Sequence, residues 1–221
     1  MVGYSWNFNV VLAYKEAIFS GAVTTLELAF LTIIIGSVLG LLLCLMRLSG
    51  NRPLSLASAA FTEIFRDLPL LVVLIWMFYA IPSLFDIRMS AFDTAALGLS
   101  LNLAAFASDI FRAGMQAIPR GQREASLALG LSEWQALREV VLPQAAAVVL
   151  PPLTGRYIET IKLTSLASVI AVNELLHVGG NIIALTYRPL EVYTVVALVY
   201  WLMIAPLVLL LGRMGVEKWR T

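Results

Sequence analysis

The chain has 221 residues, of which 60% are hydrophobic and 13% are charged, and its mean hydropathy is +0.88. Soluble domains carry about 25% charged residues, so this composition excludes an ordinary soluble fold and indicates a chain that lies mostly in lipid. The net charge of +1 gives no indication of nucleic-acid binding, and the single cysteine, Cys44, cannot form an internal disulfide.

Residues 4–19 precede the first apolar stretch and contain several aromatic residues with one Lys and one Glu. This composition predicts an interfacial helix on the outer surface of the membrane, and we assign residues 1–20 to an outer N-terminal segment. No basic region is followed directly by an apolar core, so we expect no cleaved signal peptide.

Five apolar stretches follow, at about residues 23–46, 57–81, 95–114, 145–172 and 192–211. Each is expected to be a helix, because lipid leaves a separate span no other way to satisfy its backbone polar groups. Pro69 predicts a kink in the second stretch, since it frees backbone hydrogen-bonding groups there. We therefore predict an all-α membrane protein with five transmembrane helices, a single transmembrane domain over residues 21–212 and a tail at residues 213–221.

The segment between the last two stretches, residues 173–189, contains Gly179-Gly180 and the only histidine, His177. The glycine pair predicts a turn or hinge. His177 has no second His or Cys nearby, so we expect a packing or surface role for it and predict no metal site.

Lys and Arg are unevenly distributed between the segments that join the stretches. If the N-terminus lies outside, the outer segments hold three, Lys15, Arg88 and Arg188, and the inner segments hold nine: Arg47, Arg52, Arg112, Arg120, Arg123, Arg138, Arg213, Lys218 and Arg220. Basic residues accumulate on the cytoplasmic side of a membrane. The distribution therefore predicts the N-terminus outside, the C-terminus inside and the segment around Glu124 in the cytoplasm.

A polar, helix-forming stretch at about residues 119–143 interrupts the apolar sequence. Residues 120–129 predict a short amphipathic helix, and Gly130 fits the position just past its end, where a left-handed backbone is tolerated. Ser132 and Gln135 then form a capping-box pattern that starts a second helix. The stretch therefore predicts a helix, a sharp corner and a second helix.

The second helix of this corner is predicted to be short. Trp134, Leu137 and Val141 are spaced to share one of its faces, and Pro143 is expected to end it.

The corner resembles the EAA loop of bacterial ABC importer permeases, E-A-A-x3-G-x9-I-x-L-P, with Ser126 in place of the last Ala and Val140 in place of the Ile. The resemblance implies an ABC type I importer permease in which this cytoplasmic loop supplies the coupling helix that docks on the ATPase. By the same resemblance, the coupling residues are Glu124, Ala125, Ser126, Gly130, Leu142 and Pro143.

Further motifs resemble the polar amino-acid subfamily, the histidine, glutamine and glutamate importers. Residues 65–71 resemble F-R-G-T-P-L-L, residues 112–125 resemble R-A-G…G-Q-x-E-A, and residues 162–166 resemble K-D-T-S-L. Leu142-Pro143-Gln144-Ala145 matches L-P-Q-A. The departures are Asp67-Leu68 for Gly-Thr and Leu163 for the Asp.

Three basic residues, Arg66, Arg156 and Lys162, lie within the predicted spans. An ionisable side chain at mid-membrane costs about 2.5–3.5 kcal/mol on insertion scales, so it usually faces a cavity or a partner. Glu159 lies three residues from both Arg156 and Lys162 and can pair with either.

Two interpretations of these charges stay open. In the first they line a translocation cavity and contact a zwitterionic solute, with a substrate-binding set of Arg66, Arg156, Glu159, Lys162, Thr164 and Ser165. In the second they are internal ion pairs that hold helices together. For Asp109 and Arg112 we expect a structural pair at a helix end.

No Lys follows a Gly in this chain, so the phosphate-binding loop G-x-x-x-x-G-K-[ST] is absent. The motifs H-E-x-x-H and G-x-S-x-G are absent as well, which disfavours a membrane-embedded hydrolase. We therefore expect that the chain is not an enzyme and holds no cofactor, and that ATP-Mg binds to a partner ATPase.

The sequence as a whole favours the permease subunit of an ATP-driven ABC importer, which translocates a polar amino acid or related zwitterion across the bacterial cytoplasmic (inner) membrane. The implied partners are a cytoplasmic ABC ATPase dimer, a second permease of the same or a related kind, an external solute-binding protein and membrane lipid. The alternative is a secondary transporter driven by an ion gradient, but such folds commonly have two repeated halves and no repeat is evident here. The sequence leaves open which solute is carried and whether the permeases form a homodimer or a heterodimer.

Overall fold

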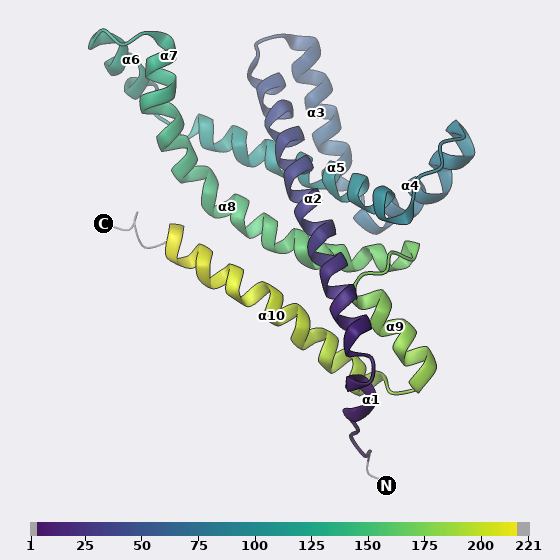
Figure 1. Cartoon of the computed structure of the whole chain (residues 1–221). Coiled ribbons are helices and arrows are strands. Elements are labelled where there is room, and N and C mark those ends of the chain that lie inside the picture. Colours follow the sequence, from purple (N-terminus) through teal and green to yellow (C-terminus); the bar gives the residue numbers. More distant parts are fainter. Residues whose placement is uncertain (1–3, 216–221) are drawn as a thin grey trace. The chain divides into compact units, whose positions relative to one another are not determined.

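The computed structural model describes residues 4–215, with side chains over residues 4–209, and every regular element in that range is a helix (Figure 1). In chain order the elements are α1 (Asn9–Leu12), α2 (Lys15–Leu48), α3 (Arg52–Asp67), α4 (Leu70–Phe85), α5 (Ala91–Gln116), α6 (Arg120–Ala128), α7 (Glu133–Gln135), the π-helix η1 (Ala136–Val141), α8 (Leu142–Leu163), the 3-10 helix η2 (Thr164–Ile170), α9 (Leu175–Thr186) and α10 (Pro189–Gly215). The predicted all-α class is confirmed.

Four helical stretches are long and apolar enough to cross a membrane: Lys15–Leu48, Ala91–Gln116, Glu133–Ile170 and Pro189–Leu209. They correspond to the first, third, fourth and fifth predicted spans. A fifth span results if α3 and α4 are counted together as one broken crossing.

The second predicted span is two helices and not one kinked helix. Pro69 has no N–H with which to continue α3, and it favours an extended backbone in the residue that precedes it. Leu68 accordingly has φ −75° and ψ 136°, and α4 begins only at Leu70. The prediction of a kink is therefore wrong, because the helix stops at Asp67.

The chain forms two compact units, and α2, α5, α8 and α10 each contribute residues to both. Unit 1 comprises Met1–Ile33, Pro69–Leu99 and Ile158–Leu209. Unit 2 comprises Ile34–Leu68, Ser100–Tyr157 and Leu210–Thr221.

In unit 1 the N-terminal segment packs against α9 and α10. Val11 and Ile18 are buried in one cluster with Leu175, Ile182 and Val192. Before α2 only the four residues of α1 are helical among the described residues, so the predicted interfacial helix over residues 4–19 is wrong. Val11 and Ile18 are buried, whereas Trp6, Phe8 and Phe19 are exposed, so the outer interfacial position of this segment stays a prediction.

Helix α9 is absent from the predicted elements and contains Gly179-Gly180 in its interior. A Cβ atom on Gly179 would lie 2.9 Å from Val196 Cγ2, so the glycine lets α9 approach α10 closely. The turn predicted at this pair is therefore wrong, because close packing and not chain reversal requires glycine here.

In unit 2 small residues bring the spans together. A Cβ atom on Gly40 of α2 would lie 2.7 Å from Ala107 Cβ, and one on Gly114 of α5 would lie 2.1 Å from Val149 Cγ2. Lipid provides no hydrophobic force between helices, so close packing of small residues is a main source of their association.

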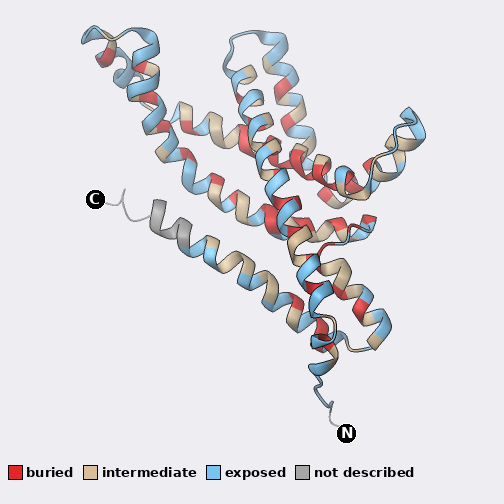
Figure 2. Ribbon diagram, viewed as in Figure 1, coloured by how far each residue is buried: buried red, intermediate tan, exposed pale blue. Residues whose placement is uncertain are grey.

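The spans differ in how much of their surface the chain itself covers (Figure 2). In the most apolar window of α5, 67% of the residues are buried, whereas the corresponding value for α10 is 11%. Helix α5 is therefore an internal helix of this chain, and α10 is covered largely by lipid or by another chain. The predicted tail, residues 213–221, lies outside the described residues from residue 216 onward, and its first three residues belong to α10.

Candidate functional site

The corner (residues 119–143) begins with α6, which ends in a Schellman motif. Gly130 adopts a left-handed φ of +87°. Its N–H donates to the Leu127 carbonyl at 3.0 Å, and the Leu131 N–H donates to the Ser126 carbonyl at 3.2 Å. The predicted helix and the predicted role of Gly130 are both confirmed.

The second half of the corner is fixed by side chains. Ser132 Oγ accepts from the Gln135 N–H at 3.3 Å, and Gln135 Oε1 accepts from the Ser132 N–H at 2.9 Å, so the predicted capping box is present. Arg123 of α6 donates from Nη2 to Glu133 Oε2 of α7 at 2.6 Å. Caps and ion pair together hold α6 and α7 in one arrangement.

Pro143 does not end the helix that follows, contrary to the prediction. The chain continues from α7 through the π-helix η1 into α8, and the Leu142 N–H donates to the Leu137 carbonyl five residues back. A wider π turn directly before a proline lets the helix continue although the proline lacks an N–H. Trp134 is 64% exposed and Val141 is 8% exposed, so these residues do not share a face.

Most residues of the corner are exposed (Figure 2). Glu124, Ala125 and Pro143 are exposed, and so is Leu142. Ser126 is buried, and its hydroxyl donates to backbone carbonyls one turn back, so its role in the corner is structural. Leu129 is 85% exposed and Trp134 is 64% exposed, so the corner presents two large apolar side chains that the described chain leaves uncovered.

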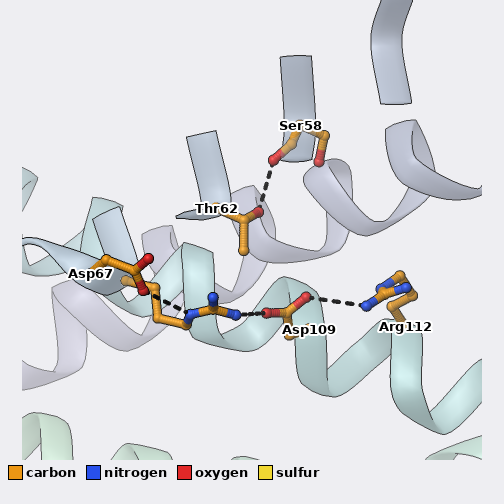
Figure 3. A network of polar contacts seen from close by, with 6 residues as sticks. Ser58, Thr62, Asp67, Asp109 and Arg112 are labelled. Atoms are coloured by element: carbon orange, nitrogen blue, oxygen red, sulfur yellow. Dashed lines mark hydrogen bonds and ion pairs between the residues drawn. The ribbon is translucent and has the colours of Figure 1, made fainter. Parts of the chain in front are cut away.

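Asp67, Asp109 and Arg112 belong to one network of charged residues in unit 2 (Figure 3), in which Arg66 of α3 joins the two aspartates. Its Nε lies 3.2 Å from Asp67 Oδ1 and its Nη1 lies 3.0 Å from Asp109 Oδ2. Asp109 also pairs with Arg112 at 3.7 Å, which confirms the expected i, i+3 pair. In the described chain Arg66 therefore pairs with two aspartates.

Arg156 of α8 is 9% exposed and contacts α5. Its Nη2 donates to Asn102 Oδ1 at 2.6 Å, and its guanidinium carbon lies 3.7 Å from the centre of the Phe106 ring. Arg156 thus has a buried amide as a hydrogen-bond acceptor and an aromatic face against its guanidinium group, both from α5.

Asn102 is a residue that the sequence interpretation missed. Its Nδ2 donates to the Phe65 carbonyl at 2.9 Å. That carbonyl would bond to the N–H four residues later in a continuing helix, but the residue there is Pro69, which has none. The only sequence signal is an isolated amide in the apolar run of residues 95–107.

Lys162 and Ser165 line an open cavity of about 580 Å³ in unit 1. The opposite wall comes from α10 and includes Tyr193, Tyr200 and Trp201. In the described chain no carboxylate forms an ion pair with Lys162. The Lys162 cavity therefore combines an ammonium group with aromatic faces.

The other predicted substrate residues of unit 1 are placed differently. Thr164 is fully buried and donates to the Ile161 carbonyl at 2.7 Å, and Ser165 donates to the Lys162 carbonyl at 2.7 Å. Glu159 is exposed and is not among the residues that line the Lys162 cavity. The structure thus brings Lys162 and Ser165 together, and the proposal that Arg66, Arg156 and Lys162 face one cavity stays a prediction.

Glu174 supports the wall of this cavity and was not predicted either. It is fully buried at the N-cap of α9, where it accepts from the N–H groups of Leu176 at 2.9 Å and His177 at 2.7 Å. Tyr200 OH donates to Glu174 Oε2 at 2.7 Å. Burial raises the pKa of the Glu174 carboxyl above its ordinary value, although these donors oppose the shift.

Among the described residues no group of three or more His, Cys, Asp or Glu side chains could hold a metal ion. The described residues contain two candidate functional features. One is the helical corner of unit 2 with its exposed apolar side chains, and the other is the Lys162 cavity of unit 1.

These features define a membrane-spanning permease with an exposed helical corner. The family model for the binding-protein-dependent transport system inner membrane component matches residues 32–215, and the chain belongs to that family.

Relatives place the chain within the polar amino-acid ABC transporter permeases. It is 37% identical to the glutamine transport system permease protein GlnP of Escherichia coli (strain K12) over 195 residues, 88% of this chain and 89% of that protein. It is 38% identical to the L-cystine transport system permease protein TcyB of Bacillus subtilis (strain 168) over 183 residues, 82% and 78% of the two chains.

The fold agrees with a crystal structure of an amino acid ABC transporter with histidines. The TM-score is 0.89 at 33% identity, over 96% of this chain and 98% of that chain. The protein is thus a multi-pass permease of the bacterial inner membrane, and it is the transport component and not the catalyst of its system.

Proposed function

We propose that this permease imports a polar amino acid, whose carboxylate binds Lys162 during passage, and that a separate ABC ATPase drives the cycle. The observation that carries the solute assignment is the Lys162 cavity, where the lysine has no ion pair within the described chain. The similarity to permeases named for glutamine and L-cystine supports the same class of solute.

The chemistry of the cavity suits a zwitterion. A lysine ammonium attracts a carboxylate as a point charge, and the faces of Tyr193 and Trp201 attract an ammonium group. A volume of about 580 Å³ is within the usual range for a small-molecule site. Lys162 is the one cationic side chain among the residues that line the cavity. It would bind the α-carboxylate, so the site has no cationic partner for a second carboxylate on the solute side chain.

The corner is the proposed contact with the ATPase. Its caps and the Arg123–Glu133 pair make it stiff, and Leu129 and Trp134 give it exposed apolar side chains that can pack into a groove. A stiff element transmits a displacement to α8, with which it is continuous through η1. ATP-Mg would bind entirely on the partner ATPase dimer.

The remaining partners follow from the same scheme. A second permease, identical or related, would complete the pathway, and a loaded solute-binding protein would act from outside. That protein can shift the permease between its states only through different affinities for them. With the N-terminus outside and the C-terminus inside, the corner faces the cytoplasm, where ATP is.

The test is transport by the purified complex in proteoliposomes. We expect the chain to co-purify with an ABC ATPase and, with binding protein present, to take up amino acid only when ATP is supplied on the corner side. Uptake that follows an imposed ion gradient and needs no ATPase would establish the secondary-transporter alternative instead.

A separate measurement addresses the solute site. Competition among glutamine, cystine, histidine, glutamate and arginine for uptake by the same complex would rank their apparent affinities. Lys162→Gln should lower the apparent affinity for every amino acid that is carried. Coupled uptake of a sugar but of no amino acid would reject the solute class while leaving the coupling scheme intact.

A further inference from the structure

An apolar groove of about 420 Å³ lies in unit 2 between the ends of α2 and α5 and the first half of α8. Leu48, Met115 and Ala146 are among the residues that line it, one from each helix. The lining side chains remain partly exposed, with Leu142 at 42% and Leu150 at 56%. The floor is fixed because Gly114 lets α5 and α8 meet closely at Val149.

The length of the groove matches one leaflet of a bilayer. Along α8 the lining runs from Leu142 to Leu153. At 1.5 Å per residue this is about 16 Å, close to half of the ~30 Å hydrocarbon thickness. If the helix ends next to the corner are set at the level of the lipid headgroups, the other end of the groove reaches about mid-membrane.

Near the corner end of each wall an arginine is the sequence neighbour of a lining residue, although none of the three is itself among the lining residues. Arg47 precedes Leu48, Arg112 follows Phe111, and Arg138 follows Leu137, and all three of these neighbours line the groove. Arg47 and Arg138 form no ion pair within the described chain.

Arg112 in particular is incompletely satisfied. Its Nε is buried and has no hydrogen-bond partner in the described chain. Its ion pair with Asp109 is long, at 3.7 Å, and Asp109 is held at 3.0 Å by Arg66.

We propose that this groove binds one acyl chain of an anionic phospholipid, whose phosphate pairs with Arg112 and is flanked by Arg47 and Arg138. Hydrocarbon is the material that surrounds exposed apolar walls of membrane-spanning helices, and basic pockets between spans select anionic headgroups. A second copy of this chain is the competing occupant, but it would have to supply both an apolar ridge and an anion at the headgroup end.

The test uses the complete transporter in nanodiscs of phosphatidylcholine that contain a phosphatidylglycerol with a photoreactive acyl chain. We expect cross-links on residues 41–48 and 142–153, displaced by unlabelled phosphatidylglycerol and much less by phosphatidylcholine. Ala146→Leu should fill the groove and reduce labelling, whereas its matched control Ala147→Leu, one residue outside the lining set, should not.

Headgroup recognition is tested by charge removal. Because each basic residue near an anionic surface contributes about five-fold in binding, Arg112→Gln should reduce the preference for phosphatidylglycerol by about that factor and the Arg112→Gln/Arg138→Gln variant by more. Arg120→Gln, an exposed arginine at the start of α6, is the control and should leave the preference unchanged. Equal competition by both lipids, labelling unaffected by Ala146→Leu, or cross-linking of these residues to a second copy in place of lipid would each overturn the proposal.

Discussion

Asn102 donates a hydrogen bond of 2.9 Å to the carbonyl oxygen of Phe65, the group that Pro69 leaves without its helical partner. The same side chain accepts from Arg156 at 2.6 Å. One amide therefore compensates the helix break between α3 and α4 and also orients a buried arginine of α8.

The first prediction concerns this amide. Asn102→Leu keeps the size of the side chain and leaves the Phe65 carbonyl and one Arg156 donor unsatisfied. An unsatisfied buried polar group costs about 1–3 kcal/mol, so we expect a clear loss of thermal stability in detergent or nanodiscs. Asn181→Leu, an exposed residue of α9, is the matched control. Equal melting temperatures for the two variants would show that the amide does not support the break.

The second prediction concerns the corner. Gly130→Pro cannot adopt a φ of +87° and lacks the N–H that bonds to Leu127, so the Schellman motif should be lost. Gly130→Ala should be milder, at about 1–2 kcal/mol of strain. Both should lower ATP-coupled uptake while the chain still reaches the membrane. Gly121→Ala, where φ is ordinary and space is open, should behave as wild type. Full coupling in Gly130→Pro would contradict a rigid corner.

The sequence predicts the local signals of this fold well. Gly130, Ser132 and Gln135 are found in the predicted roles because caps depend on residues within one turn. Four of the predicted apolar stretches correspond to single helices long and apolar enough to span a membrane. They could be predicted because length and composition suffice to identify such helices.

Features that depend on distant residues could not be predicted. Nothing near Gly179 in the sequence shows that Val196 of α10 packs against it, and nothing near Asn102 shows that a carbonyl at residue 65 needs a donor. Pro143 was misjudged for a different reason. A proline usually ends a helix, but a preceding π turn, which has no simple sequence signature, lets the helix continue.

The third prediction concerns orientation. In the Cys44→Ala permease expressed without its ATPase, which would cover the corner, single cysteines at Ser5 and at the 85%-exposed Leu129 should report opposite sides of the membrane. An impermeant thiol reagent on intact cells should label position 5 and not position 129, and inverted vesicles should give the opposite pattern. Labelling of position 129 in intact cells would show that the corner lies outside and would contradict the predicted orientation.

The fourth prediction is a pH dependence from Glu174. Its pKa is raised in the folded state by burial, so its contribution to stability is fully present below its ordinary pKa of 4.5 and is lost as the pH rises through the folded-state pKa. Glu174→Gln should therefore flatten the decline in melting temperature on raising the pH from below 4.5 toward neutrality. The exposed Glu16→Gln is the control and should keep the wild-type slope. A steeper decline in Glu174→Gln would contradict the assignment.

The last prediction separates solute contact from helix support among the three basic residues within spans. Lys162 lines a cavity and has no ion pair in the described chain, whereas Arg66 pairs with two aspartates and Arg156 is held by Asn102 and Phe106.

If Lys162 binds the carboxylate, Lys162→Gln removes a charge-assisted contact of about 1.5–3 kcal/mol, so the apparent affinity should fall roughly ten- to a hundred-fold while assembly is unchanged. Arg156→Gln should instead reduce the yield and stability of the complex, because it leaves Asn102 Oδ1 without its charged donor in a buried position. The measurement is the concentration dependence of uptake, normalised to assembled complex, for all three Gln variants. A fall in affinity in the Arg66 or Arg156 variant would show that this residue contacts the solute. Unchanged affinity in the Lys162 variant would show that Lys162 does not bind the solute carboxylate.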